Sequence, residues 1–378
     1  MSTEPSTRLY IPSLDGFRGV AILLVMVYHA GWVSGGYLGV DLFFVLSGFL
    51  ITHLLLVERE RTGSIHLGRF YARRALRLLP TLLVVVALVW VVTHHLLAGS
   101  AQMMTGRELL AIMLYYVNLP LAFEWFNIGV MRHCWSLAIE EQFYLVWPPV
   151  CAWMLARGFP ARSCFRILLG GVLALAVWRL WLTLGAENYR RIYFGTDTRA
   201  DGLLLGCCVA FLSRARGLPA GAAARGWFLG GLALFAGMVA LASTGHVRST
   251  AFLMGKGGFL GSTLGAACTL PFLLDSSAKG SWLRRPFEHP TLIWIGKLSY
   301  ALYLIHLPVF VLGNRVLRDS NFDHQDPKTL LVSRALQFLA SFALAALVYH
   351  GLEHPLARLR KRYGSAHLVV EGQRPRAE

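Results

Sequence analysis

The stretch GYLGVDLFFVLSGFLIT, residues 36–52, decides the fold class that we predict for this 378-residue chain. The apolar run continues to Val57 and carries a single formal charge, on Asp41. A helix adds about 1.5 Å per residue, so a run of this length crosses the ~30 Å hydrocarbon core of a bilayer. The stretch therefore predicts a transmembrane helix.

Comparable apolar runs recur in both directions along the chain, which is 56% hydrophobic and only 15% charged. Backbone groups in lipid are satisfied only in helices or closed barrels, and no barrel-like alternation is present. We predict an all-α, polytopic transmembrane helix bundle over residues 1–357, followed by a basic, disordered cytoplasmic tail, residues 358–378. The apolar segments are 17–33, 37–57, 76–97, 108–123, 140–156, 166–184, 201–213, 226–243, 256–274, 291–313 and 330–350.

The distribution of arginine between these segments predicts the orientation. The connection 31–36 has no charge, whereas the predicted loop 58–77 and the tail are rich in arginine. Cytoplasmic loops carry such an excess, so we expect both termini and the 58–77 loop on the cytoplasmic side of a bacterial inner membrane. The net charge of +16 has the same origin, which argues against nucleic-acid binding. The loop arginines are Arg59, Arg61, Arg69, Arg73, Arg74 and Arg77.

Eleven crossings would place the two termini on opposite sides of the membrane. The segment 108–123 is short and runs into Pro120 and Glu124. We therefore predict that 108–138 is re-entrant or interfacial, which leaves about ten crossings. Irregular backbone at that depth is tolerated only where it is buried in protein or lines a cavity.

Ionisable groups inside the predicted spans are hypotheses for functional residues. His29 lies about two-thirds along the first span, and Arg18 lies eleven residues before it. That spacing puts both side chains on one helix face, ~16 Å apart along the axis. Asp41 is expected at nearly the depth of His29. The same outer layer is predicted to hold Glu140, Glu141, Arg179, Asp197, Arg199 and Asp201.

Simpler interpretations exist for each of these groups. A histidine in a membrane helix can serve only to hydrogen-bond another helix, and for His29 taken alone this alternative stays open. Cytoplasmic arginines such as Arg73, Arg74 and Arg77 usually reflect topology and contact with lipid headgroups. None of the six cysteines shows zinc-ligand spacing, and we predict neither a metal site nor a permanently bound cofactor.

These residues also carry a family resemblance. Seven ordered stretches resemble the acyltransferase-3 family of integral membrane acyltransferases, whose first helix shows an arginine, ten residues and a histidine. The stretches are LDGFRGVA with His29 (14–29), GYLGVDLFFVLSGFLIT (36–52), RFYARRALRLLP (69–80), WSLAIEEQFYLVWP (135–148), TDTRADGLLLG (196–206), GKLSYALYLIHLPV (296–309) and EHPL (353–356).

The resemblance implies O-acylation, with acetyl the favoured group, of extracytoplasmic glycans, antibiotics or lipids, with cytoplasmic acyl-CoA as donor substrate. Together with the depth argument it implies that His29 is the general base and that Asp41 or Glu140 orients its ring. The family pattern favours Glu140 over Glu141. Arginines at the cytoplasmic side would bind the acyl-CoA phosphates: Arg18, Arg73, Arg74 and Arg77. Acceptor-side or structural roles are expected for Asp197, Arg199, Asp201, Ser299, Tyr300 and His306.

Three questions stay open at this stage. No covalent acyl-enzyme is required, although Ser136 and Ser299 are possible carriers outside any nucleophile-elbow pattern. A transporter with a charged site at the midplane is the alternative function, and inverted repeats, which we do not find, would favour it. A scaffold or sensor would not need Arg18 aligned with His29. The expected partners are membrane lipid, acyl-CoA and a glycan or other hydroxyl-bearing acceptor, without nucleic acid, and the oligomeric state is not predicted.

Overall fold

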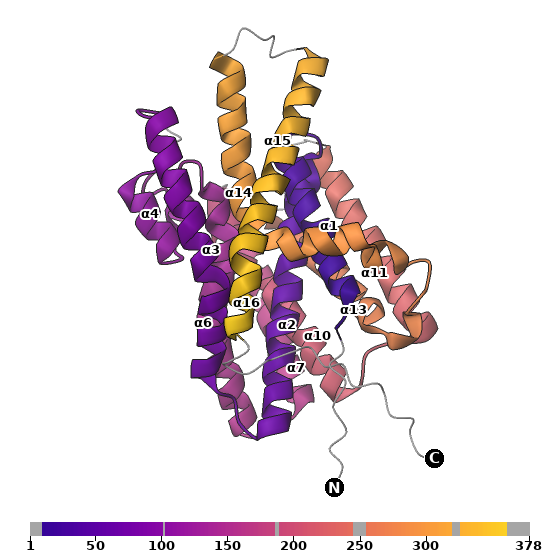
Figure 1. Cartoon of the computed structure of the whole chain (residues 1–378). Helices are drawn as coiled ribbons and strands as arrows, with labels where there is room; N and C mark the ends of the chain where they lie inside the picture. The colour runs from indigo at the N-terminus through magenta and orange to yellow at the C-terminus, as the bar shows by residue number, and fades with distance from the viewer. Residues whose placement is uncertain (1–9, 101–102, 186–188, 245–254, 320–325, 361–378) are drawn as a thin grey trace.

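The structure, a computed structural model, describes residues 10–100, 103–185, 189–244, 255–319 and 326–360. Throughout these residues the secondary structure is helical, with no β-strand, as the sequence predicts (Figure 1). The long helices are α1 (Pro12–His29), α2 (Gly39–Thr62), α3 (Leu67–Leu96), α6 (Trp135–Ala156), α7 (Ala161–Gly185), α10 (Asp201–Ala215), α11 (Gly221–Ser243), α13 (Gly258–Leu274), α14 (Pro290–Asp319) and α15 (Pro327–Val348).

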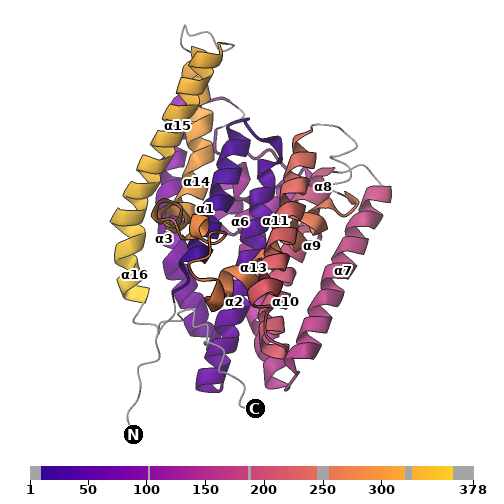
Figure 2. The same ribbon diagram turned by 90° about the vertical axis from the view of Figure 1, so that its right-hand side faces the viewer.

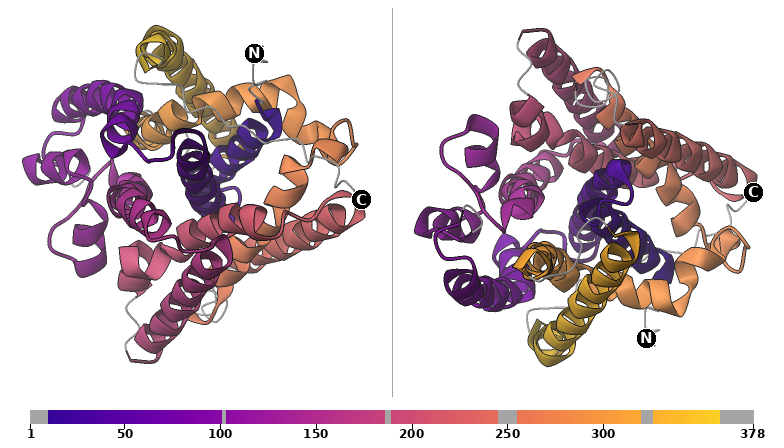
Figure 3. Two further views of the ribbon diagram at one scale, coloured as in Figure 1. Left: turned by 90° about the horizontal axis from the view of Figure 1, so that it is seen from below. Right: turned by 90° about the horizontal axis from the view of Figure 1, so that it is seen from above.

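Shorter elements connect these helices. They are η1 (Ser34–Leu38), α4 (Gly106–Met113), α5 (Asn118–Phe123), η2 (Arg132–Cys134), α8 (Tyr189–Phe194), α9 (Thr196–Arg199), η3 (Ser276–Ala278), η4 (Arg285–Glu288), the π-helical turn η5 (Tyr349–Glu353) and α16 (His354–Arg360). Helices α15 and α16 run as one rod along an edge of the molecule, opposite α7 (Figure 2). Viewed along the bundle, α1 and α2 lie at its centre (Figure 3).

Six helical segments in the described part of the chain are long and apolar enough to cross a membrane. The remaining long helices, α1, α6, α10 and α13, coincide with four further predicted crossings. The chain is therefore a polytopic helix bundle, and the number of ten crossings stays a prediction. The six segments are 34–62, 67–96, 161–184, 221–243, 290–318 and 327–357.

The segment predicted to be re-entrant consists of two short helices, α4 and α5. The break between them falls at Tyr115, whose φ of 54° is left-handed and ends the helix. The buried carboxylate of Glu108 accepts hydrogen bonds from the backbone N–H groups of Gly129, at 3.1 Å, and Met131, at 3.2 Å. An eight-residue helix covers only about 12 Å, so neither helix spans a bilayer core by itself.

Several predicted boundaries are wrong, and each shift moves a candidate residue. The connection between α2 and α3 is only residues 63–66, so Arg69 to Arg77 lie on the first turns of α3 rather than in a loop. Arginine tolerates this position because its aliphatic stem packs on apolar surface while the guanidinium reaches polar partners. Helix α6 begins at Trp135, which moves Glu140 into its second turn.

The first helix is also displaced relative to the predicted span. Helix α1 begins at Pro12, which suits the first helical position, and ends at His29, followed by Gly31 with a φ of 79°. His29 is thus the last helical residue rather than one about two-thirds along the span. At the C-terminus, α16 continues into the predicted tail to Arg360, and residues 361–378 lie outside the described residues.

Helices α2 and α10 approach each other at two glycines. A Cβ at Gly48 would collide with the carbonyl oxygen of Leu203, and one at Gly206 would collide with that of Val45. Small residues permit this kind of backbone contact, which provides much of the packing between helices in lipid. The contact fixes the start of α10 beside the middle of α2.

We predict that Gly48→Ala lowers the thermal unfolding midpoint of the purified protein in detergent, because the added methyl must push the two backbones apart. The matched control is Gly170→Ala on α7, where nothing lies within 4 Å of the position that the added methyl would take. That control should be neutral or stabilising by about 0.5–1 kcal/mol. Equal midpoints for the two variants, measured by size-exclusion chromatography after heating, would contradict the predicted contact.

Candidate functional site

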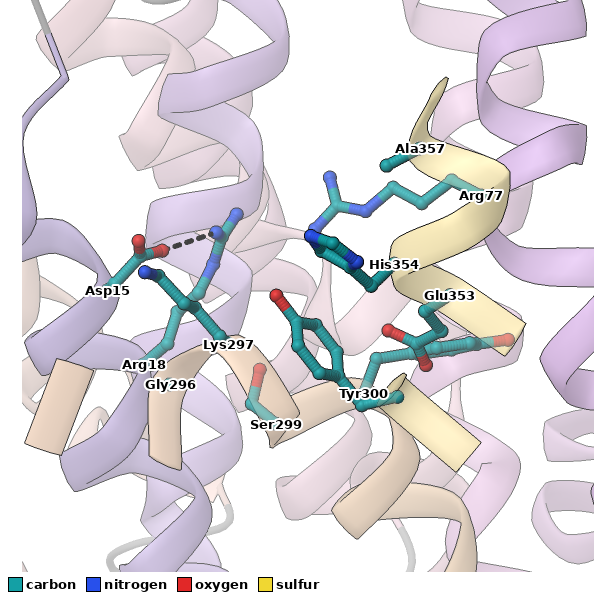
Figure 4. A pocket seen from close by; sticks show the side chains of 11 residues that line it. Asp15, Arg18, Arg77, Gly296, Lys297, Ser299, Tyr300, Glu353, His354 and Ala357 are labelled. Atoms are coloured by element: carbon teal, nitrogen blue, oxygen red, sulfur yellow. Dashed lines mark hydrogen bonds and ion pairs between the residues drawn. The ribbon is translucent and has the colours of Figure 1, made fainter. Parts of the chain in front are cut away.

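A polar cavity of about 200 Å³ lies where α1, α3, α14 and the η5–α16 segment meet (Figure 4). Four basic side chains line it, and the acidic groups among its lining are Asp15 and Glu353. Figure 4 shows Arg18 and Lys297 on one side and Arg77 and His354 on the other, with Tyr300 between them. The lining residues are Asp15, Arg18, Arg77, Gly296, Lys297, Ser299, Tyr300, Tyr349, Glu353, His354 and Ala357. We call this cavity the basic pocket.

The basic pocket exists because α1 and α14 pack closely near their N-terminal ends. A Cβ at Gly296 would collide with the carbonyl oxygen of Asp15, so the two backbones touch there. Arg18 forms an ion pair with Asp15 at 3.2 Å, and the hydroxyl of Tyr300 donates to the carbonyl oxygen of Leu78 at 2.9 Å. These contacts place Arg18 of α1 and Arg77 of α3 around one space. Ser299 and Tyr300, for which acceptor-side or structural roles were expected, also line the basic pocket.

The other two predicted donor-binding arginines have carboxylate partners outside the lining of the basic pocket. Arg73 pairs with Glu58 at 3.3 Å. Arg74 pairs with Glu141, whose Oε2 accepts from Nε at 2.9 Å, and its guanidinium lies 3.3 Å from the ring centroid of Tyr144. The structure therefore brings Arg18 and Arg77 together and separates Arg73 and Arg74 from them.

Glu140 lies beside Arg74 and Glu141 rather than beside His29. Ser47 donates a hydrogen bond to its Oε1 at 3.3 Å, and the hydroxyl of Tyr144 donates to Oε2 at 3.4 Å. The expected layer that joins Glu140 to His29 is thus not formed. The cause is the earlier start of α6 at Trp135, which moves Glu140 further along the helix than the predicted span does.

His29 belongs to a cluster of three imidazoles at the other end of α1. Nε2 of His306, on α14, lies 3.1 Å from Nδ1 of His29, and their ring centroids are 5.0 Å apart. Nδ1 of His29 also lies 3.0 Å from the carbonyl oxygen of Val25. The ring of His133, on η2, stands edge-on to His306 at 5.2 Å. We call His29, His306 and His133 the histidine cluster.

Tyr303 and Ser136 border the histidine cluster. The hydroxyl of Tyr303 donates to the backbone oxygen of His133 at 2.5 Å and lies 2.6 Å from the hydroxyl of Ser136. Sequence reasoning did not select His133 or Tyr303. The sequence could have indicated Tyr303, because it lies three residues before His306 and therefore shares its helix face. His133 stands only two residues before the matching stretch 135–148.

An apolar layer separates the basic pocket from the histidine cluster. Ile22 and Val25 lie between Arg18 and His29 on α1 and are 0% and 2% exposed. They belong to the same buried cluster as Leu302 of α14 and Val86 of α3. The two polar sites therefore occupy opposite ends of one helix, on either side of packed side chains.

Asp41 forms a buried ion pair instead of contacting His29. Its Oδ1 accepts from Arg199 at 2.5 Å, and Ser262 donates to its other oxygen. Asp41 and Arg199 are 0% and 1% exposed, and the guanidinium lies 3.6 Å from the ring centroid of Phe259. The pair joins α2 to α9, and Ser262 and Phe259 add α13 to the same junction.

A second buried pair lies close by in the fold. Arg179 of α7 contacts Asp201 of α10 at 2.9 Å and donates to the carbonyl oxygen of Thr198 at 2.7 Å. Asp197 is more exposed, and it accepts from Trp178 at 2.8 Å and from Arg191. Burial opposes ionisation of Asp197, but these hydrogen bonds outweigh it and hold the pKa of the carboxyl below its usual range. These contacts join neighbouring helices, and the acceptor-side or structural role of Asp197, Arg199 and Asp201 stays a prediction.

A bundle with a basic pocket and a histidine cluster at the two ends of its first helix fits the resemblance noted in the sequence. The family model of an acyltransferase domain matches residues 11–350, nearly the whole chain. The chain belongs to this acyltransferase-3 family of membrane acyltransferases.

Two curated relatives are similar over nearly the whole of this chain. The chain is 32% identical to the peptidoglycan O-acetyltransferase OatA of Listeria monocytogenes over 369 residues, which is 94% of this chain and 57% of the relative. It is 31% identical to the O-acetyltransferase OatA of Staphylococcus aureus (strain NCTC 8325) over 92% of this chain and 57% of the relative. The chain thus spans a little more than half the length of these relatives. No solved structure matches it significantly.

We predict that Arg199→Leu strongly lowers the thermal midpoint, because it leaves the Asp41 carboxylate buried without its cation. Breaking such a pair from one side typically costs about 3–5 kcal/mol. The double variant Asp41→Asn with Arg199→Leu removes both charges and should recover part of the loss. If the double variant is as unstable as the sum of the two single variants, Asp41 and Arg199 are not coupled and the structural assignment is wrong.

Proposed function

We propose that this chain is a multi-pass O-acyltransferase of a bacterial inner membrane, with both termini in the cytoplasm. It moves an acetyl group from cytoplasmic acetyl-CoA to a hydroxyl of an extracytoplasmic glycan. The names of the two OatA relatives support acetyl as the acyl group, and the Listeria name supports peptidoglycan as the acceptor. The observation that carries the proposal is the placement of Arg18 and His29 at opposite ends of α1, each in its own polar site.

The basic pocket is the proposed binding site for the phosphates of the donor. Arg18 and Arg77 approach it from different helices, and Lys297 and His354 add two further nitrogen-bearing side chains. Guanidinium groups match phosphate oxygens in charge and in planar geometry. The short connection between α2 and α3 (63–66), flanked by helix turns that carry arginines, and the end of α16 lie toward the same end of the molecule (Figure 1). This agrees with entry of the donor from the cytoplasm.

The acetyl-pantetheine arm then has to pass the apolar layer between the two sites. Ile22 and Val25 on α1 fill the path in this structure. We propose that they move aside when the donor binds, so that the thioester reaches His29 while water stays excluded. Exclusion of water protects the thioester from hydrolysis and strengthens polar interactions inside the site.

His29 is the proposed general base. Its Nδ1 faces the carbonyl oxygen of Val25 and the ring of His306, whereas its Nε2 has no hydrogen-bond partner among the described residues. Nε2 accepts the proton of the acceptor hydroxyl as that oxygen bonds to the thioester carbon. The C–S bond then breaks, and the CoA thiolate takes the proton from His29. The products are an O-acetyl ester and CoA with a free thiol, and no acyl-enzyme is needed.

We predict that His29→Ala lowers kcat by about 10²–10⁴, the usual contribution of a general base, while the membrane level stays normal. The assay follows release of the CoA thiol from acetyl-CoA by the purified protein in nanodiscs, with peptidoglycan fragments as acceptor. Acetyl esters on the fragments are counted by mass spectrometry. Retention of more than about a tenth of wild-type turnover would remove His29 from the role of base.

We predict that Arg77→Ala raises the KM for acetyl-CoA several-fold with little change in kcat, because phosphate contacts are the same in the ground state and the transition state. The control is Arg162→Ala, an exposed arginine near the start of α7 that does not line the basic pocket. A fall in kcat at an unchanged donor KM would instead assign Arg77 to packing or catalysis. Equal effects of the two substitutions would count against the basic pocket as the donor site.

A further inference from the structure

The side chain that faces His29 from α14 is another imidazole, not the carboxylate expected from the sequence. His306 is 0% exposed and lies in the middle of α14, which packs against α1. The described residues place neither Asp41 nor Glu140 in hydrogen-bond contact with His29. Whatever orients His29 must therefore be found among its actual neighbours.

The hydrogen bonds of His306 define which of its nitrogens carries the proton. Its Nδ1 lies 3.0 Å from the carbonyl oxygen of Leu302 and 2.9 Å from that of Tyr303. Carbonyl oxygens only accept hydrogen bonds, so Nδ1 of His306 carries the proton. In the neutral ring its Nε2 is then an acceptor, and it points at Nδ1 of His29 from 3.1 Å.

The hydrogen-bond acceptors around His29 define its tautomer in the same way. Its Nδ1 has two acceptors within reach, Nε2 of His306 and the carbonyl oxygen of Val25. Nδ1 of His29 therefore carries the proton, and Nε2 keeps the lone pair. That is the tautomer in which Nε2 can take a proton from a hydroxyl. With the Val25 oxygen alone the ring could rotate about its side-chain bonds, whereas two acceptors on different helices hold it in one orientation.

The surroundings of His306 hold it in place. The ring of His133 stands edge-on to it at 5.2 Å, the ring of Tyr303 lies 5.8 Å away, and the ring of Phe310 lies 6.1 Å away. Tyr303 is itself fixed by its hydrogen bond to the backbone of His133. A buried side chain enclosed in this way keeps its rotamer, so the acceptor that it presents to His29 is pre-organised.

We propose that His306 is the positioning residue of the reaction: it holds His29 in the tautomer with a free Nε2 and stabilises the imidazolium that forms when Nε2 takes the proton. It does so as a neutral acceptor, in the place that a carboxylate occupies in a Ser-His-Asp triad. A neutral partner costs less to bury inside the membrane than an unpaired carboxylate. The proposal rests on the proposed function of His29 as general base.

The kinetic test compares His306→Leu with His306→Gln in the purified protein in nanodiscs. Leucine removes the acceptor, and kcat per folded molecule should fall at least about tenfold at an unchanged KM for acetyl-CoA. Glutamine offers an amide oxygen at a similar reach and should recover part of kcat. The matched control is His94→Leu on α3, a histidine whose Nδ1 likewise faces the carbonyl four residues earlier but which lies outside the histidine cluster. It should leave kcat unchanged.

Two kinetic results would overturn the role of His306. One is wild-type kcat in His306→Leu. The other is an equal loss of kcat in the leucine and glutamine variants, which would indicate packing rather than hydrogen bonding. If wild-type turnover does not depend on His29, the proposed function itself fails, and the positioning role fails with it.

A spectroscopic readout does not depend on activity. Nitrogen NMR of protein with ¹⁵N-labelled histidine should show the Nδ1–H tautomer of His29 in the wild type and in His306→Gln, and a mixture of tautomers in His306→Leu. An unchanged tautomer in folded His306→Leu would overturn the positioning role even if turnover does require His29. If the leucine variant does not fold, the glutamine variant still tests the role, because a mixture of tautomers there would contradict an acceptor role for residue 306.

Discussion

The close packing of α1 against α14 is the constraint on which both ends of the candidate site depend. Three glycines permit it, because a side chain at Gly16, Gly19 or Gly296 would collide with backbone of the neighbouring helix or of η4. In lipid, where apolar side chains gain little from association, such backbone contact is a main source of helix pairing. With the two helices locked together, Arg18 faces the same cavity as Lys297, and His29 meets His306.

The buried ion pairs secure the other half of the bundle. Asp41 with Arg199 and Arg179 with Asp201 join α2, α7, α9 and α10 at positions fully removed from solvent. Charged groups inside a membrane protein are costly unless paired, so each pair strongly favours one arrangement of these helices. Their separation from the histidine cluster divides the ionisable residues into a set of buried ion pairs and a set that belongs to the two polar sites.

The sequence predicted helix type, approximate spans and the shared face of Arg18 and His29, because these depend on local periodicity. It misplaced Glu140 because the depth of a residue in the membrane was counted from the predicted first residue of its helix. Helix α6 begins five residues earlier than its apolar run suggests. It missed the contact between His29 and His306 because these residues lie 277 positions apart. Such a contact depends on which helices become neighbours, and one sequence without repeats carries no signal for that.

The central claim is that one helix, α1, carries a donor-phosphate site at one end and the catalytic imidazole at the other. A structure of the protein with bound acetyl-CoA, determined by electron cryo-microscopy in nanodiscs, tests this most directly. The account predicts phosphate density between Arg18 and Arg77, and the thioester within reach of Nε2 of His29. Phosphates bound elsewhere, or a thioester that remains on the pocket side of Ile22 and Val25 in a turnover-competent complex with acceptor, would contradict it.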